Sequence, residues 1–366
     1  MFGVRNVSAP MGREKTMNLV NIILFLILAL IFVLPLAVKQ VEENLEIFLF
    51  VMGILAAAAG KALSINLAAE IFSDVYLYVI VAIVLGGGFL FRFLSEKMSG
   101  GSVHSALKKA PAALSAFLLT VVLGLLSSVI TAIVASLFLV EIVNLLPLSR
   151  AGKIRVNIAA CFSIGLGAVL TPVGEPLATI VIGRLARDPA LHADFFYMVR
   201  TLGVYILPGI LVFGLLAAYF AKNDGSAATE GEEKIALESY PEIVFRALKI
   251  FLFLIALNLL GSGFKPIIDA YVMQIPAMGL YWINMCSAIL DNATLASAEI
   301  SASMQQSQIV AILMGLLVSG GMMIPGNIPN IISASKLKIK SREWIRLGVP
   351  LGLIAMAVYF AVIFFL

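Results

Sequence analysis

Two short segments of this chain carry the polar side chains that could do chemistry. They read SAILDNATLASAEI, residues 287–300, and TPVGEP, residues 171–176, and both are embedded in long apolar stretches. Carboxylate, amide and hydroxyl oxygens bind small hard cations, and a buried carboxyl can hold a proton in place of a cation. The segments therefore predict a site for a small inorganic cation, a proton or both. Its first members are Asp291, Asn292, Thr294, Glu175 and Thr171.

Two further segments match these in composition. IPGNIPN, residues 324–330, places Pro and Gly around Asn327 much as TPVGEP places them around Glu175. SSVITAI, residues 127–133, puts hydroxyl groups midway along an apolar stretch. The binding residues predicted here are Asn327, Asn330, Ser128 and Thr131. The residues expected to hold Na⁺ directly are Asp291, Asn292 and Glu175.

Structural roles compete with these functional ones. Asp291 or Glu175 could cap a half-helix, Asn292 could hold a hairpin turn, and each threonine could make a hydrogen bond between helices. A carboxylate at membrane depth costs at least about 2.5 to 3.5 kcal/mol, which favours a function for Asp291. Glu299 and Glu141 could relay protons, although a charge at a helix end near the interface is the favoured interpretation.

The composition indicates that the solvent of this chain is a lipid bilayer. Hydrophobic residues make up 61% and charged residues 13% of the 366 residues, and the mean hydropathy is +1.05. Soluble domains carry about a quarter charged residues, so soluble enzymes and nucleic-acid-binding proteins are excluded. We expect a multi-pass protein of the cell membrane, with apolar windows that can span about 30 Å of hydrocarbon. The clear windows are residues 19–38, 45–60, 75–93, 195–220, 243–260 and 347–366.

Four other apolar regions are too interrupted to be plain spanning helices. Residues 110–146 and 276–304 each have a polar tip near the middle, whereas 154–185 and 307–337 are each broken by Pro and Gly. Pro removes a backbone donor and loosens a helix at membrane depth. Because hairpin and broken helix follow each other twice, we predict an all-α polytopic membrane fold of two inverted repeats. Each repeat would contain a re-entrant helical hairpin and a broken transmembrane helix.

This organisation gives four parts. They are N-terminal transmembrane helices in residues 1–73, a first repeat in 74–220, a polar cytoplasmic linker in 221–241 and a second repeat in 242–366. When residues 92–109 are placed inside, most of the 25 lysines and arginines fall in inside loops, as the positive-inside rule requires. The third predicted helix then enters from outside and the helix after the linker from inside, so the repeats have opposite orientations.

Cysteine and histidine point to no metal or redox chemistry. Cys161 and Cys286 each lie alone in apolar sequence, and His104 and His192 fall in predicted loops. The interpretation is buried inert thiols and solvated imidazoles. We expect no cofactor, with Na⁺ and H⁺ as the transported or coupling ions.

At the two pairs of broken segments the sequence resembles the ion transporter superfamily, which contains arsenite permeases, divalent-anion/sodium symporters and sodium/proton antiporters of the NhaD type. LTPVGEPLATI (170–180) is similar to the antiporters' TPxG(D/E) stretch, SAILDNATLA (287–296) to their Ser…Asp-Asn hairpin, and IPGNIPNIISAS (324–335) to a Gly-Asn-containing broken helix. The resemblance covers residues 74–366 and looks closest to a small, uncharacterised family of cation transporters.

The resemblance implies an inverted-repeat homodimer that exposes one midplane site alternately to each side. Carried over by residue, it makes Asp291, Asn292 and Glu175 the ion and proton groups. The implied oxygen ligands are Thr171, Thr294 and Asn327. The sequence departs from the antiporters in its first hairpin, where Ser128 stands in the place of an acid.

The functional hypothesis is a secondary active transporter, a Na⁺/H⁺ antiporter in which the two ions compete for Asp291, coupled to Glu175. The alternative is an arsenite-type or Na⁺-coupled organic-anion (dicarboxylate) transporter, in which helix N-termini would hold the anion. Enzymatic activity is not expected. An intramembrane hydrolase could use Asp291 and Glu175 as a carboxylate pair, but the sequence has no Gly-x-Gly-Asp motif to support it.

Overall fold

The structure is a computed structural model that describes residues 19–38, 40–41, 44–98, 110–186, 193–224, 239–289 and 292–366. The described residues form helices and no strands, as the all-α prediction requires. Asp291, His104 and His192 were singled out by the sequence and lie outside the described residues.

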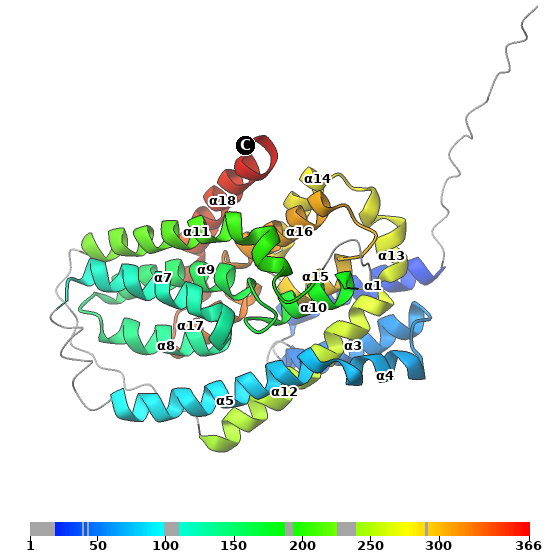
Figure 1. Ribbon diagram of the computed structural model, residues 1–366, viewed down its shortest axis with the longest axis horizontal. Helices are drawn as coiled ribbons and strands as arrows, with labels where there is room; N and C mark the ends of the chain where they lie inside the picture. Colours follow the sequence, from blue (N-terminus) through cyan, green and yellow to red (C-terminus); the bar gives the residue numbers. More distant parts are fainter. Residues whose placement is uncertain are drawn as a thin grey trace, which may run out of the picture.

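The first half of the described chain begins with four helices, followed by five that build the hairpin-like and broken regions. These helices are α1 (Leu19–Ala37), α3 (Leu45–Ala59), α4 (Ile65–Ser73), α5 (Val75–Met98), α7 (Ala112–Ile130), α8 (Ala132–Leu145), α9 (Arg150–Ala168), α10 (Pro176–Leu185) and α11 (Tyr197–Lys222). Figure 1 shows α7, α8, α9 and α11 side by side in one part of the molecule.

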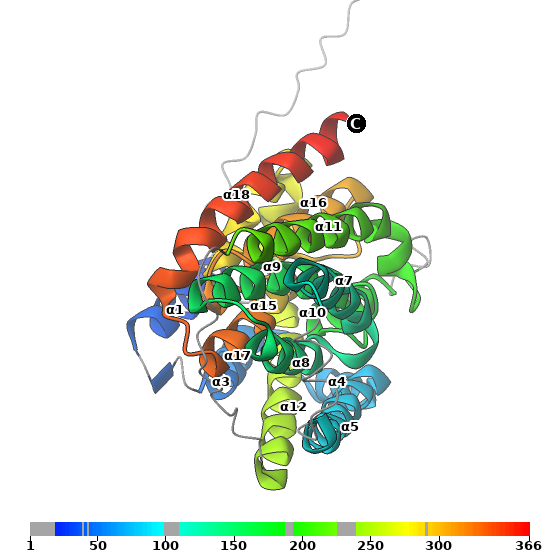
Figure 2. The ribbon, with the colours of Figure 1, turned by 90° about the vertical axis from the view of Figure 1, so that its left-hand side faces the viewer.

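The second half contains more short elements. They are α12 (Tyr240–Gly263), α13 (Lys265–Ala270), η2 (Val272–Gln274), α14 (Ala277–Ile283), η3 (Asn284–Ala288), α15 (Asn292–Glu299), α16 (Gln306–Gly320), η4 (Ile324–Gly326), α17 (Ile328–Lys336) and α18 (Ser341–Phe365). In both ribbon views α18 lies on one side of the molecule, while α5 and α12 lie on the opposite side (Figures 1 and 2).

Four described helices are long and apolar enough to cross a membrane, namely α7, α11, α12 and α18. A fifth span is obtained if the bent pair of α4 and α5 counts as one crossing. The protein is therefore a helical membrane protein with four to five candidate spans among its described residues. The predicted window 45–60 differs from this result, because the apolar helix α3 has 15 residues and is shorter than a full crossing requires. The window 19–38 forms α1, an apolar helix of 19 residues that contains Pro35 near its end. Conversely, α7 was predicted as one arm of a hairpin and is itself long enough to span.

Close packing between helices depends on glycine. On α3 and α12, Gly53, Gly60 and Gly263 allow the two backbones to touch, since a Cβ at any of these positions would meet backbone atoms of the other helix. On α7 and α9, Gly124 and Gly167 do the same. Small residues at such crossings are how helices associate in lipid, where no hydrophobic effect drives them together. The N-terminal helix α3 is thereby joined tightly to α12.

The two broken helical segments, α9–α10 and α16–α17, run antiparallel. At the start of α9, Arg150 bonds the carbonyl of Lys338, just after α17. Further along, Asn157 Nδ2 donates to Ser333 Oγ at 3.0 Å, and Cys161 Sγ contacts the carbonyl of Pro329. Near the end of α10, Arg184 donates to the carbonyl of Ile300, which precedes α16 in the chain. The first segment therefore begins where the second ends.

Candidate functional site

The first break separates α9 from α10 at residues 169–175. The Thr171 hydroxyl donates to the carbonyl of Ser128 on α7 and accepts from Val173 N at 3.2 Å. Gly174 packs directly against the carbonyl of Ala168, where a Cβ could not fit. Thr171, predicted as an oxygen ligand, thus uses its hydroxyl to hold the break in shape. Ser128 contributes its backbone carbonyl, while its own hydroxyl bonds Leu125 O within α7 at 2.8 Å.

The second break, residues 321–327, repeats this geometry. Gly326 packs against the carbonyl of Gly320 as Gly174 packs against Ala168. Asn330 Nδ2 donates to the carbonyls of Gly320 and Met323, both at 2.8 Å, and so closes the end of α16. The carbonyls that a broken helix leaves without partners are here bonded by a side chain from the following half-helix.

Glu175 and Asn327 occupy equivalent positions in the two breaks. Each is the residue immediately before its half-helix, and their backbone angles are nearly the same, with φ −157° and ψ 158° for Glu175 and φ −153° and ψ 149° for Asn327. Neither side chain bonds the amides of the first helical turn. Both are buried, at 3% and 2% exposure. The capping role that competed with a functional one for Glu175 is therefore not what its side chain does.

The junction of α7 and α8 packs on the first break. Thr131 joins these helices with a φ of +73°, a left-handed conformation that a β-branched residue seldom adopts. Its hydroxyl accepts from Val134 N at 3.3 Å, and the next amide, Ala132 N, donates to Gly174 O at 2.9 Å. The junction and the break are therefore one hydrogen-bonded unit.

A cavity of about 20 Å³ lies where these elements meet, and we refer to it as the inner cavity. Its lining includes Thr131, Glu175 and, from the second broken segment, Ile328, the residue after Asn327. The volume is of the order that one water molecule needs, about 10 to 15 Å³. A monovalent cation that has lost its hydration shell is of similar size. The N-termini of α10 and α17, with their positive dipole ends, both begin beside this cavity.

The second hairpin region contributes buried amides and hydroxyls. Asn292 begins α15 and is buried, and its Nδ2 has no hydrogen-bond partner among the described residues. Thr294 is buried on the same helix. Asn284 Nδ2 donates to Glu299 Oε2 at 2.8 Å and to Leu280 O at 2.9 Å, which ties η3 to the end of α15. Glu299, the last residue of α15, is thus half-buried and bonded to Asn284.

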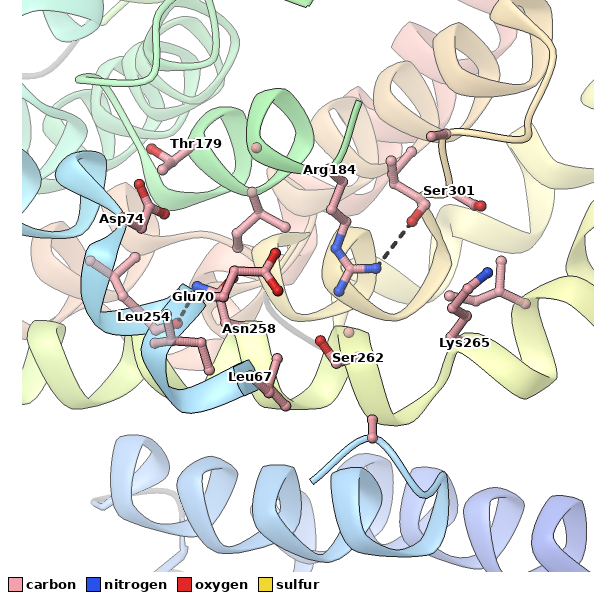
Figure 3. Close-up of a pocket in the computed structure, with 18 of the residues that line it drawn as sticks. Leu67, Glu70, Asp74, Thr179, Arg184, Leu254, Asn258, Ser262, Lys265 and Ser301 are labelled. Atoms are coloured by element: carbon pink, nitrogen blue, oxygen red, sulfur yellow. Dashed lines mark hydrogen bonds between the residues drawn. The ribbon is translucent and has the colours of Figure 1, made fainter. Parts of the chain in front are cut away.

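A second, much larger cavity of about 620 Å³ lies between α4, the ends of α10 and α12, and residues 300–303 (Figure 3). We refer to it as the polar cavity. Its charged lining residues are Glu70, Asp74, Arg184 and Lys265. Thr179 also lines it and donates to Pro172 O at 2.7 Å, so the cavity extends to within one helical turn of Glu175.

Arg184 is the functional candidate that the sequence interpretation missed. Arg200, at the start of α11, pairs with Asp194 on the surface, and its hydrogen bond holds the pKa of that carboxyl below its usual value. Arg184 Nη1 instead donates to Ile300 O at 3.1 Å, and its guanidinium lies against Gly261 of α12, where a Cβ would collide with it. The signal in the sequence that could have found it is a single arginine near the end of the apolar half-helix that follows TPVGEP.

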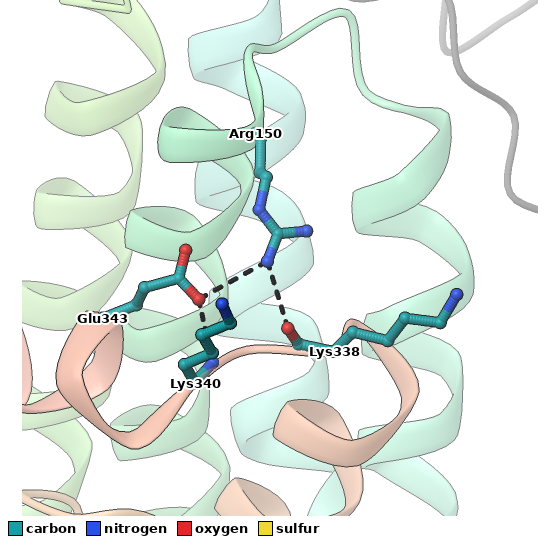
Figure 4. Close-up of polar contacts among 4 residues, drawn as sticks. All are labelled: Arg150, Lys338, Lys340 and Glu343. Carbon is teal, nitrogen blue, oxygen red and sulfur yellow. Dashed lines mark hydrogen bonds and ion pairs between the residues drawn. The ribbon is translucent and has the colours of Figure 1, made fainter.

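The opposite end of the broken segments is tied together by a small polar cluster (Figure 4). Arg150 Nη2 lies 3.0 Å from Lys338 O and 3.4 Å from Glu343 Oε2, and Glu343 Oε2 also accepts from Lys340 N at 2.8 Å. The cluster connects the start of α9 to the end of α17 and the start of α18.

The structure therefore brings together Thr131, Glu175 and the residue next to Asn327 around the inner cavity. Thr171 and Ser128 form the frame of that cavity rather than its lining. Asn292 and Thr294 lie on α15, which packs against α10, the half-helix that Glu175 precedes. Asp291 precedes Asn292 in a part of the chain that the structure does not describe.

Comparison with known proteins corrects the family assignment made from short motifs. The family model that matches is described as a protein of unknown function (DUF1646), and the match extends over residues 21–366. No curated protein matches the chain. The assignment to the ion transporter superfamily is therefore corrected, since the family that matches is described only as being of unknown function. The match covers nearly the whole sequence, so the chain belongs to the DUF1646 family.

Proposed function

We propose that this protein is a secondary active transporter that exchanges Na⁺ for H⁺ across the membrane. In this proposal the two broken segments and their preceding hairpins form inverted repeats, and the inner cavity is part of a midplane ion site. Glu175 and Asp291 supply the carboxylates, and Asn292, Thr294 and Asn327 supply neutral oxygens. The proposal rests on the geometry and composition of the site, without support from any family assignment.

The observation that carries the proposal is the equivalence of Glu175 and Asn327. Two discontinuous helices that run antiparallel, with half-helix N-termini at corresponding positions, are the arrangement by which secondary transporters build ion sites. Here both N-cap side chains are buried and leave their own helix amides without a side-chain cap. A side chain that only stabilised a helix end would bond those amides.

The charge of the site favours exchange of monovalent cations. A carboxylate beside the N-termini of α10 and α17 is partly compensated by their dipoles, but a fixed negative charge remains. At each of the two carboxylates, one Na⁺ or one H⁺ neutralises that charge equally well. Because only the neutral site is inexpensive to move through a low-dielectric region, the site would cross the membrane loaded with one ion or the other. This is the coupling that an antiporter requires.

The test is a proton-flux measurement in liposomes. Purified protein is reconstituted with a pH-sensitive dye inside, and a Na⁺ gradient is imposed. We expect Na⁺-dependent proton movement from the wild type, and a loss of about tenfold or more in Glu175→Gln and Asp291→Asn, since each removes a charged ligand. Glu46→Gln is the matched control, because Glu46 pairs with Lys249 at 3.5 Å, on α3 and away from the breaks.

Two results would overturn the proposal. Folded wild-type protein that moves no protons in response to Na⁺ would exclude Na⁺/H⁺ exchange. Activity in Glu175→Gln equal to that of Glu46→Gln would remove Glu175 from the site.

A second candidate, an arsenite or dicarboxylate carrier, is favoured by one observation. Arg184 and Lys265 line the polar cavity, beside the carboxylates of Glu70 and Asp74, and could bind an anionic substrate there. If Na⁺ moves no protons, uptake of labelled arsenite and labelled dicarboxylate into the same liposomes is the measurement that separates this candidate.

A further inference from the structure

A continuous series of polar contacts passes through the second hairpin region. It begins at Ile300 and Ser301, which line the polar cavity, and their chain neighbour Glu299 bonds Asn284 at 2.8 Å. The carbonyl of Asn284 accepts from Ser319 Oγ at 2.9 Å. Ser319 is followed by Gly320, whose carbonyl accepts from Asn330 at 2.8 Å. The polar cavity is thus connected to the second break through side chains and carbonyls of η3, α15 and α16.

Three buried polar atoms along this series have no hydrogen-bond partner among the described residues. They are Asn284 Oδ1, Ser287 Oγ and Asn330 Oδ1. All three residues are fully buried. An unpartnered buried polar atom costs free energy, so several in one series call for an explanation beyond folding. Each of these atoms leaves a hydrogen-bonding position that a water molecule can take, and a water or a hydroxyl can pass on a proton, whereas an amide oxygen only accepts hydrogen bonds.

Glu299 is the carboxyl of this series. It accepts a hydrogen bond from the neutral amide of Asn284 and is half-buried at the end of α15, beside η3. The elements that pack against α15 carry these titratable groups: Cys286 on η3, Arg184 on α10, Lys265 with Asp269 on α13, and Tyr240, Glu242, Arg246 and Lys249 in the first half of α12. Lys265 and Asp269 pair with each other at 2.7 Å, and Arg184 is engaged by Ile300 O.

We propose that Glu299 is a proton-exchanging group separate from the cation site, taking up and releasing one proton between the polar cavity and the second break. On release the carboxyl becomes a carboxylate that Asn284 stabilises, and on uptake the reverse occurs. This inference rests on the proposed Na⁺/H⁺ exchange and adds the route by which H⁺ reaches the site.

The test compares two transport modes in the same liposomes. Exchange of radiolabelled Na⁺ for Na⁺ needs no net proton movement, whereas Na⁺ uptake driven by a pH gradient does. We expect Glu299→Gln to retain Na⁺/Na⁺ exchange within about twofold and to lose pH-driven uptake by about tenfold or more. Glutamine keeps an oxygen that accepts from Asn284, so the tie between η3 and α15 is preserved. Glu299→Asp, which still titrates, should recover part of the coupled uptake.

Glu175→Gln and Glu46→Gln are the two control variants. Glu175→Gln should lose both transport modes and Glu46→Gln neither. If Glu299→Gln loses both modes, or neither, Glu299 is not a separate proton group and the inference is wrong. If the wild type performs neither mode, the proposed function itself has failed, which is a distinguishable outcome.

A spectroscopic measurement checks the group without transport. Infrared difference spectra between acid and alkaline pH should contain a buried protonated-carboxyl band that disappears in Glu299→Gln. Asn284→Ala keeps the carboxyl and removes its donor, so the band should remain but titrate at higher pH. An unchanged band in Glu299→Gln would contradict the proposal.

Discussion

Individual residues in the two breaks are constrained by backbone contact as much as by chemistry. Gly174 and Gly326 each lie against a carbonyl at the end of the preceding half-helix, and each is followed by the proposed ligand. Thr131 has a left-handed backbone conformation, and the next amide, Ala132 N, donates a hydrogen bond to the carbonyl of Gly174. The positions of Glu175 and Asn327 therefore depend on their neighbours having no Cβ.

Gly174→Ala should destabilise the protein by about 1 to 3 kcal/mol, because the new methyl group would collide with the Ala168 carbonyl. The measurement is the midpoint of thermal unfolding in detergent. Gly183→Ala, on the half-helix α10 that follows the break, is the control, since a Cβ there meets nothing within 4 Å. It should stabilise α10 by about 0.5 to 1 kcal/mol. Equal midpoints for the two variants would show that the break can relax around a side chain.

Among the elements, α9 is the helix most thoroughly held in place. Its middle packs on α7, α11 and α17, and its start is fixed from two directions, by the Arg150 cluster and by Asp224 at the end of α11. Asp224 accepts from Ser149 N and from Ser149 Oγ, both at 2.6 Å, and Gly152 leaves room for the carboxylate. By contrast α10, beyond the break, contacts few elements besides α15. The half-helix that follows Glu175 is therefore packed against fewer elements than α9, the half-helix before the break.

Asp224→Asn should lower stability by about 1 to 3 kcal/mol, because an amide replaces one of the two acceptors that Ser149 uses. Asn223→Ala, one residue earlier and exposed, removes only a bond within its own helix and should change stability by less than about 0.5 kcal/mol. Denaturation followed by near-ultraviolet circular dichroism compares the two. A larger loss in Asn223→Ala would mean that the end of α11 is held in another way.

At the scale of the whole molecule, composition and Pro/Gly punctuation predicted the all-helical membrane class and the positions of the two breaks. The TPVGEP and IPGNIPN segments were found because Pro and Gly interrupt helices for local reasons. Contacts that join distant segments were not predictable. Arg184 reaches Gly261 and Ile300, and Glu299 reaches Asn284, only because α10, α12 and α15 pack together, and no local pattern encodes that packing. The lengths of apolar segments also gave wrong predictions: α3 was predicted to span and is too short, and α7 was predicted as one arm of a hairpin and is long enough to span.

The distribution of lysine and arginine gives the molecule a predicted orientation, with the polar cavity outside and the Arg150 cluster inside. In a variant without Cys161 and Cys286, Ser303→Cys should react with a membrane-impermeant maleimide added to intact cells. Ser341→Cys, equally exposed, should react only after the cells are permeabilised. Labelling in the reverse pattern would invert the predicted orientation and would make the polar cavity cytoplasmic.

The contact of the Arg184 guanidinium with Gly261 limits which side chains position 261 can carry. The arginine occupies the volume that any side chain at position 261 would need, and its bond to Ile300 O holds it there. A methyl group at 261 would meet both the guanidinium of Arg184 and the backbone carbonyl of Ser297, so the arginine side chain would have to leave this position. The place of a positive charge in the lining of the polar cavity is therefore decided by a glycine on α12 as well as by the arginine itself.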